Sequence, residues 1–288
     1  MPFLYHWYVD FISVLSLFLL METPARRTRK VRMTPRLHFD VSVYTSDAIF
    51  PTHRHDEMQL SIVLRGGVTE TVGSRTEIGQ TLSVGSKDSG LFHADQFHRD
   101  GAKIARLSVP YSVMNDFLEP DRSISDWRWT HDPRVARPFF ALVRRAKESS
   151  LRSFPATDPD VTDLLAAFSA RPKETKPGEP PRWLEQTVTE LRDTWTADTT
   201  VHDVARRAGV HPVYLARCVR RWYGTTLGDE LRRLRLSASI AMLTAAGRAT
   251  IAAVAHRSGF SDEAHLCRNA KEILGLTPRR LRRLIQEA

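Results

Sequence analysis

Apolar and polar residues alternate between Leu37 and Val109, and the spacing of apolar residues becomes helical further along the chain. Within the first stretch the period is two, as at Phe39, Val41 and Val43, and glycines interrupt it at short intervals. This pattern is typical of short antiparallel strands in a barrel or a sandwich. From residue 111 onward the spacing is that of amphipathic helices. We therefore predict an α+β multidomain protein, with a β-barrel over 34–110, helices over 111–170 and an all-α domain over 182–288.

The all-α segment contains one pattern twice. Ala205–Gly209 returns as Ala255–Gly259 at an offset of 50 residues, and Gly224 returns as Gly275 at an offset of 51. In each copy a small residue allows two helices to approach closely, and a glycine that can adopt a left-handed conformation ends the first helix. A short turn and a second helix follow, as in a helix-turn-helix unit. We predict two such units, the second with one extra residue in its turn.

A single amphipathic helix from Leu227 to Ala246 is predicted between the two units. Its roughly 20 residues span roughly 30 Å, close to the roughly 34 Å of one turn of B-DNA. Two recognition helices held this far apart can enter successive major grooves on one face of DNA. Capping residues stand at the predicted helix starts, namely Asp198 or Thr200, His211-Pro212, Thr250, Ser261-Asp262 and Thr277-Pro278.

Positive charge is concentrated in the same segment. The formal net charge of the chain is +9, and residues 182–288 contain 18 basic and 11 acidic residues, 17 of the basic ones being Arg. Arginine is well suited to forked hydrogen bonds with phosphate and guanine. A basic run alone also fits a solvated helix face, but beside a duplicated helix-turn-helix it favours double-stranded DNA as the partner. The only cysteines, Cys218 and Cys267, form no disulfide framework, which favours a reducing, cytoplasmic location.

Residues 182–288 resemble the DNA-binding domain of AraC/XylS-type transcription regulators, in which a linker helix joins two helix-turn-helix units. The second unit carries the family signature through Ile251, Ala255, Gly259, Phe260, Asp262, Arg268, Lys271, Gly275, Thr277 and Pro278. The family usually has Phe where this chain has Val219, Leu266 and Ala270. We expect larger neighbours to fill the space there: Trp222, Tyr223 or Ile273.

The resemblance implies a sequence-specific transcription regulator rather than an enzyme, controlled by a small-molecule effector bound in the N-terminal barrel. RNA polymerase is an implied partner, and no cofactor is expected. Regulators of this type generally form homodimers through helices that follow the barrel. The alternative for residues 111–170 is that these helices only pack on the barrel and complete its core.

The candidates for contact with DNA lie near the start of each recognition helix. In the first helix they are His211, Val213, Tyr214, Arg217, Arg220 and Arg221, and in the second Glu263, His265, Arg268 and Asn269. Arg217 can donate two hydrogen bonds to guanine, Val213 can pack on a thymine methyl group, and Asn269 can pair with adenine. Arg220 and Arg221, one turn further on, are expected to meet phosphate.

Two segments of the barrel resemble the half-motifs of cupin barrels, in which two His, a Glu and a later His can hold a metal. Position by position, His53, His55 and His93 fit this pattern, but the Glu position holds Gln59, a poor ligand for a hard divalent ion. We therefore expect these four residues to contact an effector and no metal to bind. His98, beyond the matching position, is expected in a loop. The alternative function is a cupin-type metal enzyme fused to a DNA-binding tail.

The N-terminal residues 1–33 form an apolar and basic extension. Phe3–Met21 is nearly all apolar, although His6 and Asp10 interrupt it, and a basic cluster follows. A membrane-anchored sensor is one interpretation, and a start at Met21 or Met33 is the other; we expect no membrane partner. Residues 171–181, rich in Pro and charge, are predicted to be an interdomain linker.

Overall fold

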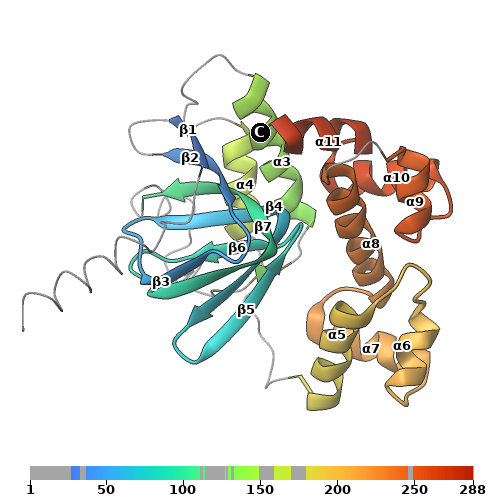
Figure 1. Ribbon diagram of the computed structural model, residues 1–288. Coiled ribbons are helices and arrows are strands. Elements are labelled where there is room, and N and C mark those ends of the chain that lie inside the picture. Colours follow the sequence, from blue (N-terminus) through green and yellow to red (C-terminus); the bar gives the residue numbers. More distant parts are fainter. Residues whose placement is uncertain are drawn as a thin grey trace, which may run out of the picture.

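A computed structural model describes residues 27–32, 37–110, 113, 127, 129–130, 133–148, 159–169, 180–245 and 249–287. A curved antiparallel sheet forms the N-terminal part and helices form the C-terminal part (Figure 1). The strands are β1 (Arg27–Arg32), β2 (His38–Tyr44), β3 (Ile49–His53), β4 (Met58–Val72), β5 (Arg75–Gln80), β6 (Val84–Lys87), β7 (His93–Val109) and β8 (Trp129–Thr130).

Two long strands, β4 and β7, organise the barrel. They pair with each other from Met58↔Val109 to Thr71↔Ala94, while β2 and β3 pair with β7 and β5 and β6 pair with β4. The register shifts around Gly66, where a Cβ atom would lie 2.0 Å from the carbonyl oxygen of Gly101. Both glycines have a positive φ, which other residues rarely adopt. The two strands therefore bend together here, and each contributes to both layers of the barrel.

The outer face of the barrel is apolar and covered, whereas much of the inner face is polar. Met58, Leu60, Ile62 and Leu64 of β4 are buried in one cluster with the helices that follow the barrel. Alternation along the strand turns Gln59, Ser61 and Val63 the other way, into the barrel. The hydrophobic positions that predicted the strands thus pack mainly against helices.

The N-terminal boundary and two local predictions need correction. Strand β1 pairs with β2 from Arg27↔Val43 to Arg32↔His38, so the sheet begins within the predicted extension 1–33. Strand β8 lies in the region predicted to be helical, because Trp129 pairs with Gly85. His98 lies in β7 rather than in a loop, with its Nε2 3.0 Å from the Thr69 hydroxyl.

The predicted apolar stretch 3–21 lies outside the described residues, and so does most of the predicted linker 171–181. Among the helices within the described ranges, none is both long enough and apolar enough to cross a bilayer.

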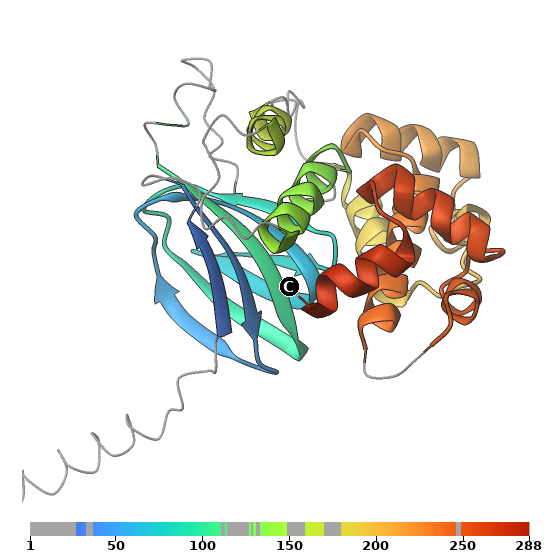
Figure 2. The same cartoon turned by 90° about the horizontal axis from the view of Figure 1, so that it is seen from above.

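The helices form two groups. After the barrel come α3 (Pro133–Glu148) and α4 (Pro159–Ser169), and the C-terminal domain contains α5 (Arg182–Thr194), α6 (Val201–Arg207), α7 (Pro212–Tyr223), α8 (Leu227–Thr244), α9 (Ile251–Arg257), α10 (Glu263–Leu274) and α11 (Pro278–Glu287). Helix α3 lies between the sheet and the C-terminal helices (Figure 2). The predicted α+β class, with a barrel and an all-α domain, is confirmed.

The apolar faces of α3 and α4 are buried within the chain. Phe139, Phe140 and Leu142 of α3 and Leu164 and Leu165 of α4 are fully buried in the cluster that includes the outer face of the barrel. The ion pair between Arg145 and Asp160 joins the two helices, with 3.3 Å between the guanidinium and the carboxylate. This arrangement favours packing on the barrel over the alternative of a dimer interface for this region.

The bend at Gly66 predicts a specific sensitivity to a methyl group. In Gly66→Ala the new Cβ would overlap the Gly101 backbone, so we expect the barrel to lose several kcal/mol of stability. Gly73→Ala is the matched control, because Gly73 also has a positive φ but has no atom within 4 Å of its Cβ position; it should lose only about 1 kcal/mol. Thermal denaturation followed by circular dichroism measures both. Equal effects would show that the close approach of β4 and β7 is unimportant.

Candidate functional site

The C-terminal domain contains two helix-turn-helix units of equal dimensions. Helices α6 and α9 have 7 residues each, and α7 and α10 have 12. Gly209 and Gly259, in the turns, have φ values of 67° and 82°, so both glycines adopt the predicted left-handed conformation. The second recognition helix starts 51 residues after the first, whereas its partner helix starts 50 residues after its counterpart. The predicted extra residue in the second turn is therefore confirmed.

Side-chain caps start these helices at the predicted residues. Thr200 forms a capping box with Asp203, and Thr250 accepts a hydrogen bond from the backbone N–H of Ala253. His211 caps α7, with Pro212 as the first helical residue. Asp262 caps α10 by accepting from the N–H of His265 at 2.6 Å. That backbone hydrogen bond, assisted by Ser261, lowers the pKa of Asp262 below its ordinary value.

In each unit, small and branched residues pack between the two helices at the predicted positions. Ala205 and Ala255 are fully buried where the helices meet, and Leu215 and Leu266 face the partner helix. Of the larger residues expected to fill the space left by the missing Phe, Trp222 and Tyr223 pack against the core of the first unit, and Ile273 packs against the core that contains the second.

Helix α8 joins the units but buries a different face at each end. Leu227, Leu231 and Leu234 belong to the core of the first unit, whereas Leu236 and Ile240 belong to the core that contains the second unit. At about 100° per residue these two sets lie on roughly opposite faces of the helix. The predicted helix exists, but its 18 residues do not have one continuous apolar face.

The two units also touch directly near the middle of α8. A Cβ atom on Gly259 would lie 2.3 Å from the carbonyl oxygen of Ala197, just before α6. The guanidinium of Arg235 donates to the carbonyls of Ala197 at 3.1 Å and Thr199 at 3.0 Å. Gly259 therefore allows a close approach that fixes one unit against the other.

A buried ion-pair network, which the sequence pattern did not predict, attaches α5 to α8. Glu230 accepts hydrogen bonds from Arg192 at 2.9 Å and from Arg233 on its own helix. Burial opposes ionisation of Glu230, but the two guanidinium groups outweigh it and lower the pKa of this carboxyl. The three-residue spacing of Glu230 and Arg233 on one helix could have predicted their ion pair. The pair of Glu230 with Arg192 could not be predicted, because the two residues lie far apart in the sequence.

Most of the predicted DNA-contact residues are exposed, and those within α7 lie on one face of that helix. On α7 they are His211, Val213, Tyr214, Arg217, Arg220 and Arg221, and on α10 they are Glu263 and Arg268; His265 is half-buried. The apolar Val213 and Tyr214 are 57% and 46% exposed. These side chains are therefore accessible to a partner at the start of each recognition helix.

Asn269 is a correction to this set. It is only 6% exposed, and its side-chain amide donates to the carbonyl of His265 at 2.9 Å. Because it lies one position after Arg268 on α10, the helix turns it toward the core and away from solvent. In this structure its amide therefore supports the helix and is turned away from the exposed side of α10.

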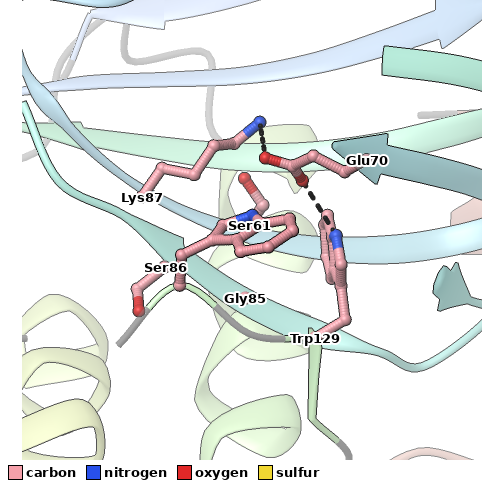
Figure 3. Close-up of a pocket in the computed structure, with 7 residues that line it drawn as sticks. Ser61, Glu70, Gly85, Ser86, Lys87 and Trp129 are labelled. Atoms are coloured by element: carbon pink, nitrogen blue, oxygen red, sulfur yellow. Dashed lines mark hydrogen bonds and ion pairs between the residues drawn. The ribbon is translucent and has the colours of Figure 1, made fainter. Parts of the chain in front are cut away.

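The barrel interior contains a charged cluster that the sequence analysis also missed. Figure 3 shows Lys87 and Trp129 converging on Glu70, with Nζ 3.0 Å from Oε1 and the indole N–H donating to Oε2 at 2.9 Å. Trp129 fits only because Gly79 and Gly85 lie beneath it; a Cβ on either would come within 3.0 Å of the indole ring. The indole therefore closes this part of the interior.

The three predicted histidines do come together at one end of the interior. The ring centroids of His53 and His93 are 4.3 Å apart, and those of His55 and His93 are 5.2 Å apart. Burial, followed by the charges of Lys87 and Arg106, lowers the pKa of His55 to about 3. Burial and Lys87 also lower the pKa of His93. At a pKa of about 3 the imidazole of His55 is neutral at ordinary pH.

The interior has little free space and several polar atoms without partners. The cavity beside Ser61, Lys87 and Arg106 measures about 10 Å³, which is room for about one water molecule. Among the described residues, buried side-chain atoms that lack a hydrogen-bond partner include Gln59 Oε1, Ser61 Oγ, His93 Nε2, Asp95 Oδ1 and Arg106 Nε. Gln59 thus faces the interior, but no contact places it in the histidine cluster.

The barrel holds the C-terminal domain by two cations at helix ends. Arg65 of β4 donates to the carbonyl of Thr244, the last residue of α8, at 3.2 Å. Lys103 of β7 donates to the carbonyl of Ile285, near the end of α11, at 2.6 Å. Cations at helix C-termini satisfy free carbonyls and the helix dipole. With α3 packed on α10 and α11, these contacts couple the barrel to the second unit.

These features define a double helix-turn-helix domain joined to an antiparallel β-barrel. Residues 204–284 match a family model described as a helix-turn-helix domain, and the C-terminal part of the chain is accordingly a helix-turn-helix domain of the AraC type. No curated protein matches the chain at a significant level.

Several solved structures show distant similarity to this chain. A single-residue variant of ToxT from Vibrio cholerae, in its apo form, is 12% identical over 88% of this chain and 99% of its own, with a TM-score of 0.38. The C-terminal domain of AraT, a response regulator from Geobacillus stearothermophilus, is 22% identical over 37% and 88% of the two chains, with a TM-score of 0.33. A cupin superfamily protein from Desulfitobacterium hafniense is 10% identical over 30% and 77%, with a TM-score of 0.28.

Proposed function

We propose that this chain is a sequence-specific, DNA-binding transcription regulator, controlled by a small-molecule effector through its N-terminal barrel. The proposal rests on two recognition helices of the same length, α7 and α10, which are connected by α8. Each has exposed residues near its N-terminus. The 18 residues of α8 span about 27 Å, somewhat less than the roughly 34 Å of one DNA turn. Both units can therefore engage neighbouring grooves.

Arginine occupies the same position in both recognition helices. Arg217 of α7 and Arg268 of α10 are 51 residues apart, the same offset that separates the starts of the two helices. We propose that Arg217 reads guanine through two hydrogen bonds, with Val213 against a thymine methyl group. Arg220 and Arg221, one turn further along α7, are assigned to phosphates. His211 and Tyr214 of α7, with Glu263 and His265 of α10, complete the proposed reading surface.

Replacing Arg217 by Ala should weaken specific DNA binding by about 1–3 kcal/mol. The measurement is fluorescence anisotropy with a duplex selected from a random pool by the wild-type protein. Arg75→Ala is the matched control, because Arg75 is an exposed arginine on β5 of the barrel, and it should leave binding unchanged.

The dependence of DNA affinity on salt tests whether the chain contacts phosphates. Wild-type affinity should fall steeply as salt rises, because phosphate contacts release counterions. Full affinity in Arg217→Ala would remove this residue from the reading surface. A flat salt response of the wild type would contradict DNA as the partner.

Lengthening α8 should uncouple the two units. Four alanines inserted between Arg235 and Leu236 add about 6 Å and turn the second unit by about 40°. We expect the inserted variant to lose tight binding to a duplex with both half-sites, because the two units no longer fit adjacent grooves together. Binding to a duplex with one half-site, measured in the same assay, is the control. Unchanged affinity for the full site would mean that one unit alone reads DNA.

For the effector we propose the polar interior of the barrel, with His53, His55, Gln59 and His93 as contacts. Ser61 and Arg106 contribute further unpartnered polar atoms there. Because the cavity is only about 10 Å³, an organic effector has to displace Trp129. That residue lies just before α3, which packs on α10 and α11. Movement of Trp129 would therefore reach the second unit.

Substitution of Trp129 tests whether a change in the barrel is transmitted through α3 to the second unit. Trp129→Ala should change DNA affinity several-fold although the residue is remote from α7 and α10, because α3 loses its anchor on the barrel. Trp129→Phe keeps an aromatic ring but loses the hydrogen bond to Glu70, so its effect should be smaller. Thermal denaturation checks that both variants fold, since truncating a buried Trp costs about 3–5 kcal/mol. Wild-type affinity in a folded Trp129→Ala variant would contradict the route.

The remaining partners follow from this role. We propose a cytoplasmic location for the chain and include RNA polymerase among its partners. A homodimer is also compatible with the proposal, although α3 and α4 bury their apolar faces within one chain. The chain is assigned as a regulator and not as an enzyme.

A further inference from the structure

The cavity in the barrel interior is lined by charges of both signs, and the two signs come from opposite sides of a bend. Strands β4 and β7 pair Ser61 with Arg106 on one side of the bend at Gly66, and Glu70 with Asp95 on the other. All four paired residues line the same cavity of about 10 Å³. The bend therefore brings a basic side, with Arg106, to face an acidic side, with Glu70 and Asp95.

The basic side of the cavity has hydrogen-bond donors to spare. Nη2 of Arg106 donates to the Tyr44 hydroxyl at 3.0 Å, and Nη1 lies 3.8 Å from Asp40, which does not line the cavity. Among the described residues, Arg106 Nε and Ser61 Oγ have no hydrogen-bond partner, although both side chains are buried. Buried polar groups of this kind are unfavourable unless a partner meets them. A ligand that binds at this side has to bring an acceptor.

The acidic side of the cavity calls for a donor. Within the part of the chain that the structure describes, Oδ1 of Asp95 has no hydrogen-bond partner, and the Lys87 ammonium group is 3.9 Å from it but 3.0 Å from Glu70. The other oxygen of Glu70 accepts from the indole of Trp129 at 2.9 Å (Figure 3). An effector that displaces Trp129 removes this N–H and has to replace it. A cationic donor suits two carboxylates best, because hydrogen bonds between ionised groups are the strongest.

We propose that the effector is a small zwitterion that carries one carboxylate and one ammonium group. The carboxylate accepts from Arg106 and Ser61. The ammonium group donates to Asp95 and, in place of the indole, to Glu70. This assignment rests on the proposed function, since it gives the chemical class of the effector bound in the barrel interior.

The balance of charge around the cavity supports a ligand without net charge. The charged residues that line it are two cations, Lys87 and Arg106, and two carboxylates, Glu70 and Asp95, so their formal charges cancel. A ligand with a single charge would leave that charge uncompensated in a buried place, which is unfavourable. A zwitterion leaves none, and the separation of its two charges matches the separation of the basic and acidic sides.

Thermal denaturation of the full-length chain without DNA tests the ligand class, because a ligand that binds the folded chain raises its melting temperature. The zwitterionic probes are 4-aminobutanoate, β-alanine and the common protein amino acids. Each is compared with its singly charged analogues, such as butanoate and butylamine for 4-aminobutanoate. Glycerol and erythritol represent uncharged polyols. We expect at least one zwitterion to raise the melting temperature while its singly charged analogues and the polyols have little effect.

Substitutions then test the orientation of the bound zwitterion by calorimetry. Asp95→Asn should weaken its binding at least tenfold, and should reduce the preference for the zwitterion over its carboxylate analogue, because one of the two carboxylates that hold the ammonium group is lost. Asp100→Asn, at an exposed carboxylate of the same strand, is the matched control and should bind as the wild type does. Ser61→Ala should weaken the zwitterion and its carboxylate analogue equally. Melting curves without ligand establish that each variant folds, and Ser61→Ala, which loses only a hydroxyl group, decides the test if Asp95→Asn does not.

The outcomes distinguish this proposal from the proposed function. If no zwitterion raises the melting temperature, or if only singly charged compounds or polyols do, the zwitterion assignment is wrong, while the role in DNA binding is unaffected. Equal affinities of Asp95→Asn and Asp100→Asn, or an unchanged preference for the zwitterion in Asp95→Asn, would remove the ammonium group from Asp95. Full affinity in Ser61→Ala would remove the carboxylate from the basic side. A chain that binds the zwitterion but no DNA contradicts the regulator and not the ligand class.

Discussion

The arrangement of the C-terminal domain depends on one helix that supports two separate cores. The N-terminal half of α8 packs into the first helix-turn-helix unit through Leu231 and Leu234, and its C-terminal half packs into the second through Leu236 and Ile240. Since the buried face changes between Leu234 and Leu236, the helix fixes both the separation and the relative rotation of the units. The contact of Gly259 with Ala197 adds a second constraint on the same geometry.

Local and repetitive features of this domain could be predicted from the sequence. A duplicated pattern, a left-handed glycine and a capping Thr or Asp each act within a few residues, so the two units, their caps and the extra residue in the second turn were all recognisable. Asn269 was assigned to the wrong side because one position on a helix turns a side chain by about 100°. The sequence pattern did not specify the register of α10 closely enough to decide between neighbours.

In the barrel, the strands and the histidines could be predicted from the sequence, but the contacts in the interior could not. The alternation that predicted its strands is real, but the apolar side faces helices and the polar side faces inward. The histidines were found because cupin-like half-motifs place them at short spacing. Glu70, Lys87 and Trp129 were missed, since they come from three different strands and meet only after β4 bends at Gly66. Asp95 stands two residues from His93, yet only the fold shows that it faces both His53 and His93.

Arg65 and Lys103 attach the barrel to the second helix-turn-helix unit and not to the first. Both cations reach helix ends that belong to the second unit, whose core is continuous with that of α3, whereas the first unit has a core of its own. A movement that arises in the barrel therefore reaches the second unit first. It reaches the first unit through α8 and through the contact of Gly259 with Ala197, so the two helix-turn-helix units respond in series and not in parallel.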